Sequence, residues 1–94
     1  MERPESTSQP RLAAGCRLTE PNGAERMLLF PEGVIRVQGT GREILEHCDG
    51  QRTVQKIVEE LQAQARYSAA DPSRIQEEVG SFLEQLHQKR VIDY

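Results

Sequence analysis

The sequence predicts an α+β, winged-helix-like domain in which a short three-stranded antiparallel meander is followed by three α-helices. Two patterns predict this order. Short extended stretches separated by Pro, Asn and Gly occupy residues 16–38. From residue 40 onward, apolar side chains recur at the spacing of helices that bury one face. Because the chain has 94 residues, it has room for one domain.

Two extended stretches and a turn open the predicted meander. Residues 16–19 alternate between apolar and polar side chains, and the Pro-Asn-Gly-Ala sequence at residues 21–24 is typical of a tight turn. Residues 26–30 form the second strand, which begins with a charged residue and continues as an apolar run. The two stretches are therefore expected to form a hairpin.

A third strand follows the turn at residues 31–33. Successive side chains of a strand point to opposite faces, so Ile35 and Val37 share one face. The other face carries Val34, Arg36 and Gln38.

The first helix is expected to begin with residues 40–43, since their sequence Thr-Gly-Arg-Glu fits a capping box. Gly50 is expected to end this helix in a left-handed conformation. The apolar face of the helix contains Ile44, Leu45 and Cys48.

Capping residues also predict where the other two helices begin. Thr53 is expected to cap the second helix, while Asp71 caps the third and Pro72 fits its first position. The apolar stripe of the second helix consists of Val54, Ile57, Val58, Leu61 and Ala65. That of the third consists of Ile75, Val79, Phe82, Leu83 and Leu86. Residues 91–94 are expected to form an extended tail.

The ends of the chain differ in composition. Residues 1–10 contain no apolar side chain after Met1, except for two prolines, so we expect a flexible N-terminal arm. Residues 11–94 then form the single folded domain.

Composition excludes two classes of partner. The chain has 12 Lys and Arg against 15 Asp and Glu, a net charge of −3, so it lacks the basic excess that binds nucleic-acid backbones. Its longest apolar run, residues 27–30, is far shorter than the roughly 20 residues that span a bilayer. The first thirty residues contain no apolar signal core, which favours a cytoplasmic protein.

The residues that could carry chemistry do not form a catalytic or metal-binding pattern. Cys16 and Cys48 match no metal motif or disulfide scaffold, and His47 and Cys48, as helix neighbours, point about 100° apart. Cys48 is better interpreted as a buried, inert thiol, and His87 as a surface residue. We therefore expect no enzyme activity, cofactor or metal.

A winged-helix-like fold suits a DNA-binding regulator or a general protein-interaction domain. The third helix does not favour DNA, because its three basic and three acidic residues between 73 and 90 cancel. Salt dependence is a simple test, because DNA binding through phosphates weakens steeply with salt, whereas binding of a protein segment as an added strand depends on salt much less.

Four segments together resemble the PqqD family of pyrroloquinoline quinone (PQQ) biosynthesis. The resemblance covers about residues 11–92. The segments are Pro31-Glu32-Gly33, Ile44-Leu45, Cys48-Asp49-Gly50 and the Val79, Phe82, Leu83, Leu86 spacing. In this family a Gly often stands at the position of Arg90, and Asp at that of Glu78.

The resemblance implies a winged-helix-like peptide chaperone, called a RiPP recognition element. Such a protein binds the precursor peptide PqqA and presents it to the radical-SAM enzyme PqqE. The precursor adds as a strand in a groove between the third strand and the third helix. The third-strand residues that this implies are Val34, Ile35, Arg36 and Val37.

Helical projection suggests which residues of the third helix face the groove. With Ile75 at 0° and about 100° per residue, Val79, Phe82 and Leu86 fall within about 40°, as a core stripe. A ridge beside it, between about 80° and 140°, contains Gln76, Gly80, Leu83 and His87. On this interpretation the bound backbone approaches Gly80, so Gly80→Leu leaves stability intact and weakens peptide binding. Close packing of Gly80 against another helix, or simple tolerance of a glycine on an exposed face, is the alternative.

The sequence leaves the oligomeric state open. The loop at residues 66–70 could permit an exchange of elements between two copies, which would give a homodimer.

Overall fold

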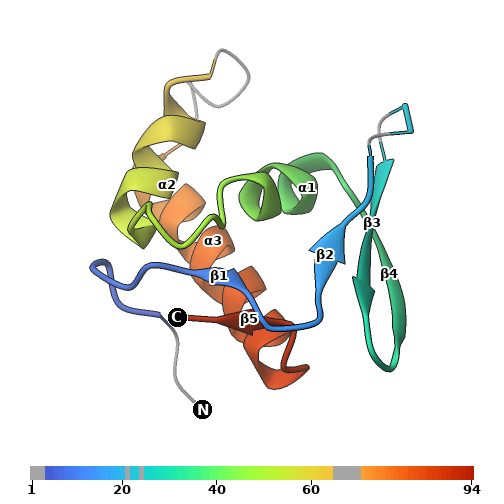
Figure 1. Cartoon of the computed structure of the whole chain (residues 1–94). Helices are drawn as coiled ribbons and strands as arrows, with labels where there is room; N and C mark the ends of the chain where they lie inside the picture. The colour runs from blue at the N-terminus through green and yellow to red at the C-terminus, as the bar shows by residue number, and fades with distance from the viewer. Residues whose placement is uncertain (1–3, 21, 24, 65–70) are drawn as a thin grey trace.

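The predicted meander is present and forms one side of the molecule (Figure 1). The computed structural model describes residues 4–20, 22–23, 25–64 and 71–94. The sheet has the order β2-β3-β4, with every neighbouring pair antiparallel. Its strands are β2 (Arg17–Leu18), β3 (Glu25–Phe30) and β4 (Gly33–Gln38).

Three helices follow the sheet, as predicted. They are α1 (Gly39–Glu46), α2 (Val54–Gln62) and α3 (Pro72–Gln88). The Thr53 hydroxyl accepts a hydrogen bond from the Lys56 N–H, and the Asp71 carboxylate accepts one from the Ser73 N–H. Both predicted caps are therefore confirmed. Ala65 and the loop at residues 66–70 lie outside the described residues.

The predicted limits of α1 are wrong at both ends. The helix begins at Gly39, before the predicted box, and ends at Glu46. The N–H groups of His47 and Cys48 donate to Ile44 and Leu45, which closes the last turn tightly. Gly50 is left-handed, with φ 78°, but it lies in the following loop, where its N–H donates to the Pro10 carbonyl at 3.0 Å.

A second sheet, which the sequence did not predict, joins the two ends of the chain (Figure 1). Strand β1 (Arg11–Leu12) pairs antiparallel with β5 (Ile92–Asp93), so the expected tail is a short strand. Within the expected N-terminal arm, the Ser8 carbonyl accepts from the Val54 N–H at 2.9 Å. Residues 4–10 of that arm therefore lie against the start of α2 in this structure.

The core lies between the sheet and the helices. Every element contributes: the fully buried side chains include Leu28 of β3, Ile57 of α2, Val79 and Leu83 of α3, and Ile92 of β5. On β4, Val37 is buried and Ile35 half-buried, whereas Val34, Arg36 and Gln38 are exposed. The predicted alternation of this strand is confirmed.

Three charged side chains tie the hairpin of β2 and β3 to α1. The Glu46 carboxylate accepts hydrogen bonds from Arg42 Nε at 2.9 Å and from Arg26 Nη1 at 3.1 Å, and Arg42 also donates to the Gly23 carbonyl. Partial burial raises the pKa of Glu46, but the hydrogen bonds from Arg42 and Arg26 outweigh it and leave the pKa below its usual value. These contacts fix the hairpin against the helix that follows β4.

Helix α3 ends in a Schellman motif whose left-handed residue is an arginine. The Val91 N–H donates to the Leu86 carbonyl, and the Arg90 N–H donates to His87. Arg90 has φ 62°, a conformation that glycine adopts at much lower cost. Val91 and Leu86 are both buried, as expected for the apolar contact of this motif. The arginine thus keeps the geometry at an energetic cost.

We predict that Arg90→Gly stabilises the protein by about 0.5–1 kcal/mol. The variant removes the left-handed penalty of about 1–2 kcal/mol, which is larger than the entropy cost of glycine, about 0.5–1 kcal/mol. Equilibrium urea unfolding measures the change. Lys89→Gly is the matched control, since Lys89 has φ −85° and gains nothing from glycine. An Arg90→Gly protein no more stable than the wild type would contradict this account.

Candidate functional site

The outer edge of β4 is the main candidate for a binding site. β4 is the last strand of its sheet, and among the described residues no strand pairs with its outer side. Such an edge offers unused N–H and C=O groups to an extended peptide.

Two hydrogen bonds on the far side of β3 reveal which β4 groups point outward. The Thr19 N–H donates to the Met27 carbonyl at 2.9 Å, and the Met27 N–H donates to Thr19 Oγ1 at 3.0 Å. The backbone groups of Met27 therefore face β2, so its partner on β4, Arg36, belongs to a non-hydrogen-bonded pair. The N–H and C=O of Arg36 must then point away from β3, to the open edge.

Strand periodicity extends this assignment along β4. Val34 directs its backbone groups outward like Arg36, and so does the N–H of Gln38, whose carbonyl joins the first turn of α1. Ile35 and Val37 direct theirs to β3. The side chains of Val34 and Arg36 are exposed, and Arg36 Nε lies 3.7 Å from Glu25 Oε1 in a loose ion pair. The four predicted β4 residues thus divide into an edge-facing pair and a sheet-facing pair.

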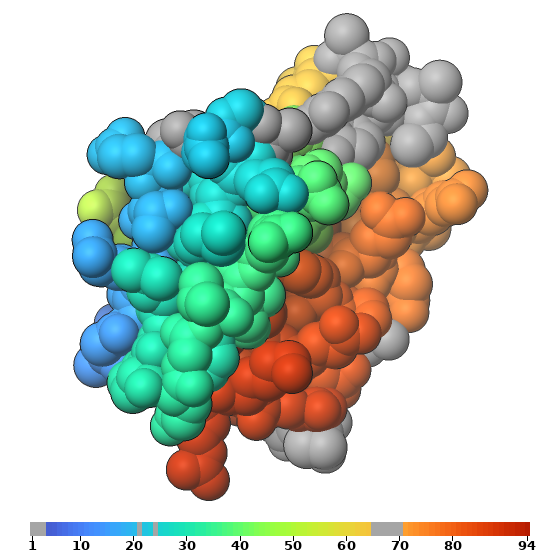
Figure 2. Space-filling model, turned by 90° about the vertical axis from the view of Figure 1, so that its right-hand side faces the viewer, coloured from blue at the N-terminus to red at the C-terminus, as the bar shows by residue number. Residues whose placement is uncertain are grey.

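Helix α3 flanks this edge. Figure 2 shows β4, in green, beside the orange and red residues of α3 on one face of the molecule. Phe82 of α3 reaches the residues that follow β4: a Cβ atom at Gly41 would lie 3.1 Å from the Phe82 ring. Phe82 is half-buried. It is a candidate lining residue that the helical projection assigned to the core stripe.

Two of the four residues of the predicted ridge on α3 are buried in the free protein. Leu83 has no exposed surface and belongs to the core, and Gly80 is buried as well. The buried arc of α3 therefore runs from Ile75 through Val79 and Leu83 toward Gly80. Periodicity gives the width of an apolar stripe, but it does not show on which flank of the stripe other elements continue to cover the helix. On α3 the covered flank is the one that contains Leu83 and Gly80.

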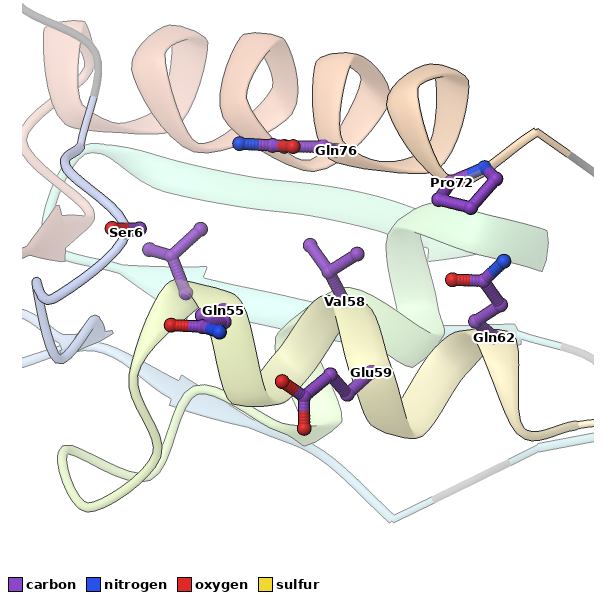
Figure 3. Close-up of a pocket in the computed structure, with 8 residues that line it drawn as sticks. Ser6, Gln55, Val58, Glu59, Gln62, Pro72 and Gln76 are labelled. Carbon is purple, nitrogen blue, oxygen red and sulfur yellow. The ribbon is translucent and has the colours of Figure 1, made fainter.

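The other two ridge residues lie at separate places. Gln76 lines a cavity of about 420 Å³ between α2, α3 and the N-terminal segment, with Ser6, Val58 and Pro72 among its other walls (Figure 3). His87 lies near the end of α3, where its ring stacks on Tyr94 with 4.4 Å between centroids. The structure therefore does not gather the eight predicted residues into one groove.

Because Gly80 is buried, we predict that Gly80→Leu lowers the free energy of unfolding by about 1–2 kcal/mol. The cost of forcing a leucine side chain into a packed position, about 3 kcal/mol, is larger than the gain of about 1 kcal/mol from replacing a helical glycine. Gln85→Leu, on an exposed position of the same helix, is the control and should change stability by less than about 0.5 kcal/mol. Chemical denaturation compares the two variants. Unchanged stability of Gly80→Leu would restore the earlier interpretation of an open groove there.

The histidine and cysteine at the end of α1 have structural contacts. His47 Nδ1 lies 2.7 Å from the Glu43 carbonyl oxygen and Nε2 lies 3.5 Å from Glu60. The Cys48 thiol donates to the Ile44 carbonyl at 3.2 Å. Within the described part of the chain, no three His, Cys, Asp or Glu side chains form a group that could hold a metal ion.

Burial controls the reactivity of Cys48. Desolvation, with a smaller contribution from the charge of Asp49, raises the pKa of this thiol to about 12. Burial also raises the pKa of Cys16, together with the charges of Glu32 and Asp93. The prediction that Cys48 is a buried thiol is confirmed.

We predict that Cys48 resists a thiol reagent such as DTNB at pH 8, because the thiolate is the reacting species and is scarce four pH units below the pKa. Unfolding in urea should release it. Cys16→Ser isolates Cys48, and Cys48→Ser is the reference for the half-buried Cys16. Equal rates for native and unfolded Cys16→Ser protein would refute the prediction.

The exposed surface of α3 carries both signs of charge. Arg74 Nε lies 3.8 Å from Glu78 Oε1, an exposed pair separated by one helical turn. Such a surface lacks the basic stripe that a recognition helix uses on DNA. No helix in the part of the chain that the structure describes is long and apolar enough to cross a membrane.

The fold is that of a RiPP recognition element, a module associated with ribosomally synthesised and post-translationally modified peptides. It is similar to the solution structure of the PqqD truncation of Methylobacterium extorquens PqqCD, described as a functional, stand-alone recognition element. The TM-score is 0.72 and the identity 31%, over 90% of this chain and 88% of that one. The heterocyclase TruD shares the fold, with a TM-score of 0.62 and 20% identity, over 90% of this chain and 11% of TruD.

Sequence comparison identifies the family. The family described as Coenzyme PQQ synthesis protein D (PqqD) matches residues 25–92, so the chain belongs to the PqqD family. A PqqA binding protein of Stutzerimonas stutzeri is 40% identical over 83% of this chain and 82% of its own length. Another, of Xanthomonas euvesicatoria, is 34% identical over 90% of each chain. The predicted family resemblance is confirmed.

Proposed function

We propose that this protein binds a PqqA-like precursor peptide as an added strand on the outer edge of β4 and presents it to a PqqE-like radical-SAM enzyme. Relatives named PqqA binding proteins support the choice of peptide. The protein acts in the cytoplasm, where the precursor is made, and contributes no catalytic residue, cofactor or metal of its own.

The orientation of the β4 backbone is the observation that carries this proposal. Val34 and Arg36 each offer a donor and an acceptor, and Gln38, whose carbonyl belongs to the first turn of α1, adds a donor; this every-second-residue pattern is what an extended peptide needs to pair. Bound there, the peptide lies beside α3, where the half-buried Phe82 offers an apolar surface to its inward side chains. Backbone pairing supplies affinity and the side-chain contacts supply sequence preference.

We predict that Arg36→Pro weakens binding of the PqqA-like peptide at least tenfold, about 1.4 kcal/mol, and leaves the fold intact. Proline removes an N–H that points to the open edge and is not used by β3. The matched control is Arg36→Thr, which loses the same charged side chain but retains the N–H. Isothermal titration measures both, with circular dichroism to verify folding.

Val37→Pro distinguishes edge binding from general damage to the strand. The Val37 N–H faces β3, so this variant should lose stability as well as binding. Strand addition at β4 is wrong if folded Arg36→Pro protein binds the peptide as tightly as Arg36→Thr. If Arg36→Thr loses as much affinity as Arg36→Pro, the guanidinium and not the backbone recognises the peptide.

A further inference from the structure

The face of the sheet that points away from the helices carries a cluster of apolar side chains. Residues 27–30 of β3 are a continuous apolar run, a pattern typical of a strand buried on both faces. The structure buries one face: Leu28 has no exposed surface, and Phe30 packs against the core. Met27 and Leu29 point to the opposite face and are not part of the core cluster.

Neighbouring strands complete this surface. Val34 lies opposite Leu29 on β4 and is 56% exposed, and Arg36 lies opposite Met27. On β2, Arg17 lies opposite Leu29 from the other side. We call these five residues, Arg17, Met27, Leu29, Val34 and Arg36, the outer sheet face. Figure 2 looks toward this side of the sheet, where the blue-to-green strands lie next to α3.

A solvated face of an antiparallel sheet is commonly polar, with alternation along each strand. Here three apolar side chains at adjacent positions lie between two arginines, and Glu25 and Gln38 lie at the end of the same face. Met and Arg are enriched in protein–protein interfaces, and an apolar centre with a polar rim is the usual anatomy of such a site. The composition of the outer sheet face therefore indicates a surface that another protein covers.

Strand addition connects this surface to the peptide. A peptide strand on the edge of β4 directs alternate side chains to the two faces of the extended sheet. Its outward side chains then lie in line with Val34 and Arg36, so the peptide and the outer sheet face form one continuous surface. A protein that covers this surface contacts both the chain and its bound peptide.

We infer that the outer sheet face is the docking surface for the enzyme that modifies the peptide, and that the bound peptide completes it; this inference rests on the proposed function. A second copy of the chain is a poorer occupant. Stable dimers bury about 800 Å² or more on each partner, whereas this face offers three apolar side chains, of which Met27 and Leu29 are already half-buried. A small contact suits a partner that must release the protein after each modified peptide.

The double variant Met27→Gln/Leu29→Gln tests the inference, because both residues lie on the central strand, away from the peptide edge. Binding of the purified radical-SAM enzyme is measured by titration with and without the PqqA-like peptide. The variant should lose at least tenfold in enzyme affinity and less than twofold in peptide affinity. Arg17→Glu, on an exposed position of the same face, should weaken enzyme binding at least fivefold and is available if the double variant does not fold.

Two controls use other surfaces. Val58→Gln places the same polar group on a half-buried position of α2, and Arg74→Glu makes the same charge reversal as Arg17→Glu on α3. Both should bind the enzyme like the wild type. The inference is overturned if the outer-face variants bind the enzyme as tightly as the wild type. It is also overturned if light scattering shows that the wild type is a dimer and that these variants are monomers. Failure of the wild type to bind the peptide would instead refute the proposed function.

Discussion

The position of β3 between β2 and β4 is the constraint on which the candidate site depends. Because Met27 uses its backbone groups toward Thr19, Leu28 must pair toward β4, and the outward groups of β4 follow by alternation. A shift of β4 by one residue would reverse every assignment on this strand and would also turn Val37 and Ile35 out of the core. The buried Val37 therefore holds the edge of β4 in its binding orientation.

The remainder of the fold fixes the elements on either side of that edge. The ion pairs of Glu46 with Arg26 and Arg42 hold the hairpin against α1, and α1 follows directly from β4. Helix α3 is anchored by its buried arc, by the turn at Arg90 and by the pairing of β5 with β1. The edge of β4 thus lies between two fixed elements, which lowers the ordering cost that a bound peptide must offset.

Local signals in the sequence predicted the structure well. Thr53 and Asp71 act within their own first helical turn, and the alternation of residues 34–38 depends only on strand geometry, so each could be inferred from neighbouring residues. The pairing of Arg11 with Asp93 could not, because two-residue strands carry no pattern and their partners lie at opposite ends of the chain.

The candidate site could be inferred only in part, because it too depends on contacts between distant parts of the chain. The β4 residues followed from periodicity and family resemblance, but the hydrogen bonds of Thr19 were needed to separate Val34 and Arg36 from Ile35 and Val37. On α3, the spacing of apolar residues could not decide whether Leu83 or Phe82 is more deeply buried. That depends on where the sheet and α2 lie around the helix, which a single helical projection does not contain.

Amide hydrogen exchange, followed by NMR residue by residue along β4, tests the central claim most directly. In the free protein, the N–H groups of Ile35 and Val37 should exchange slowly, because they donate to β3, and those of Val34 and Arg36 should exchange fast. Saturation with the PqqA-like peptide should slow exchange at Val34 and Arg36 selectively. Peptide binding that leaves these two amides as fast as before, or that protects only residues elsewhere in the chain, would contradict strand addition at this edge.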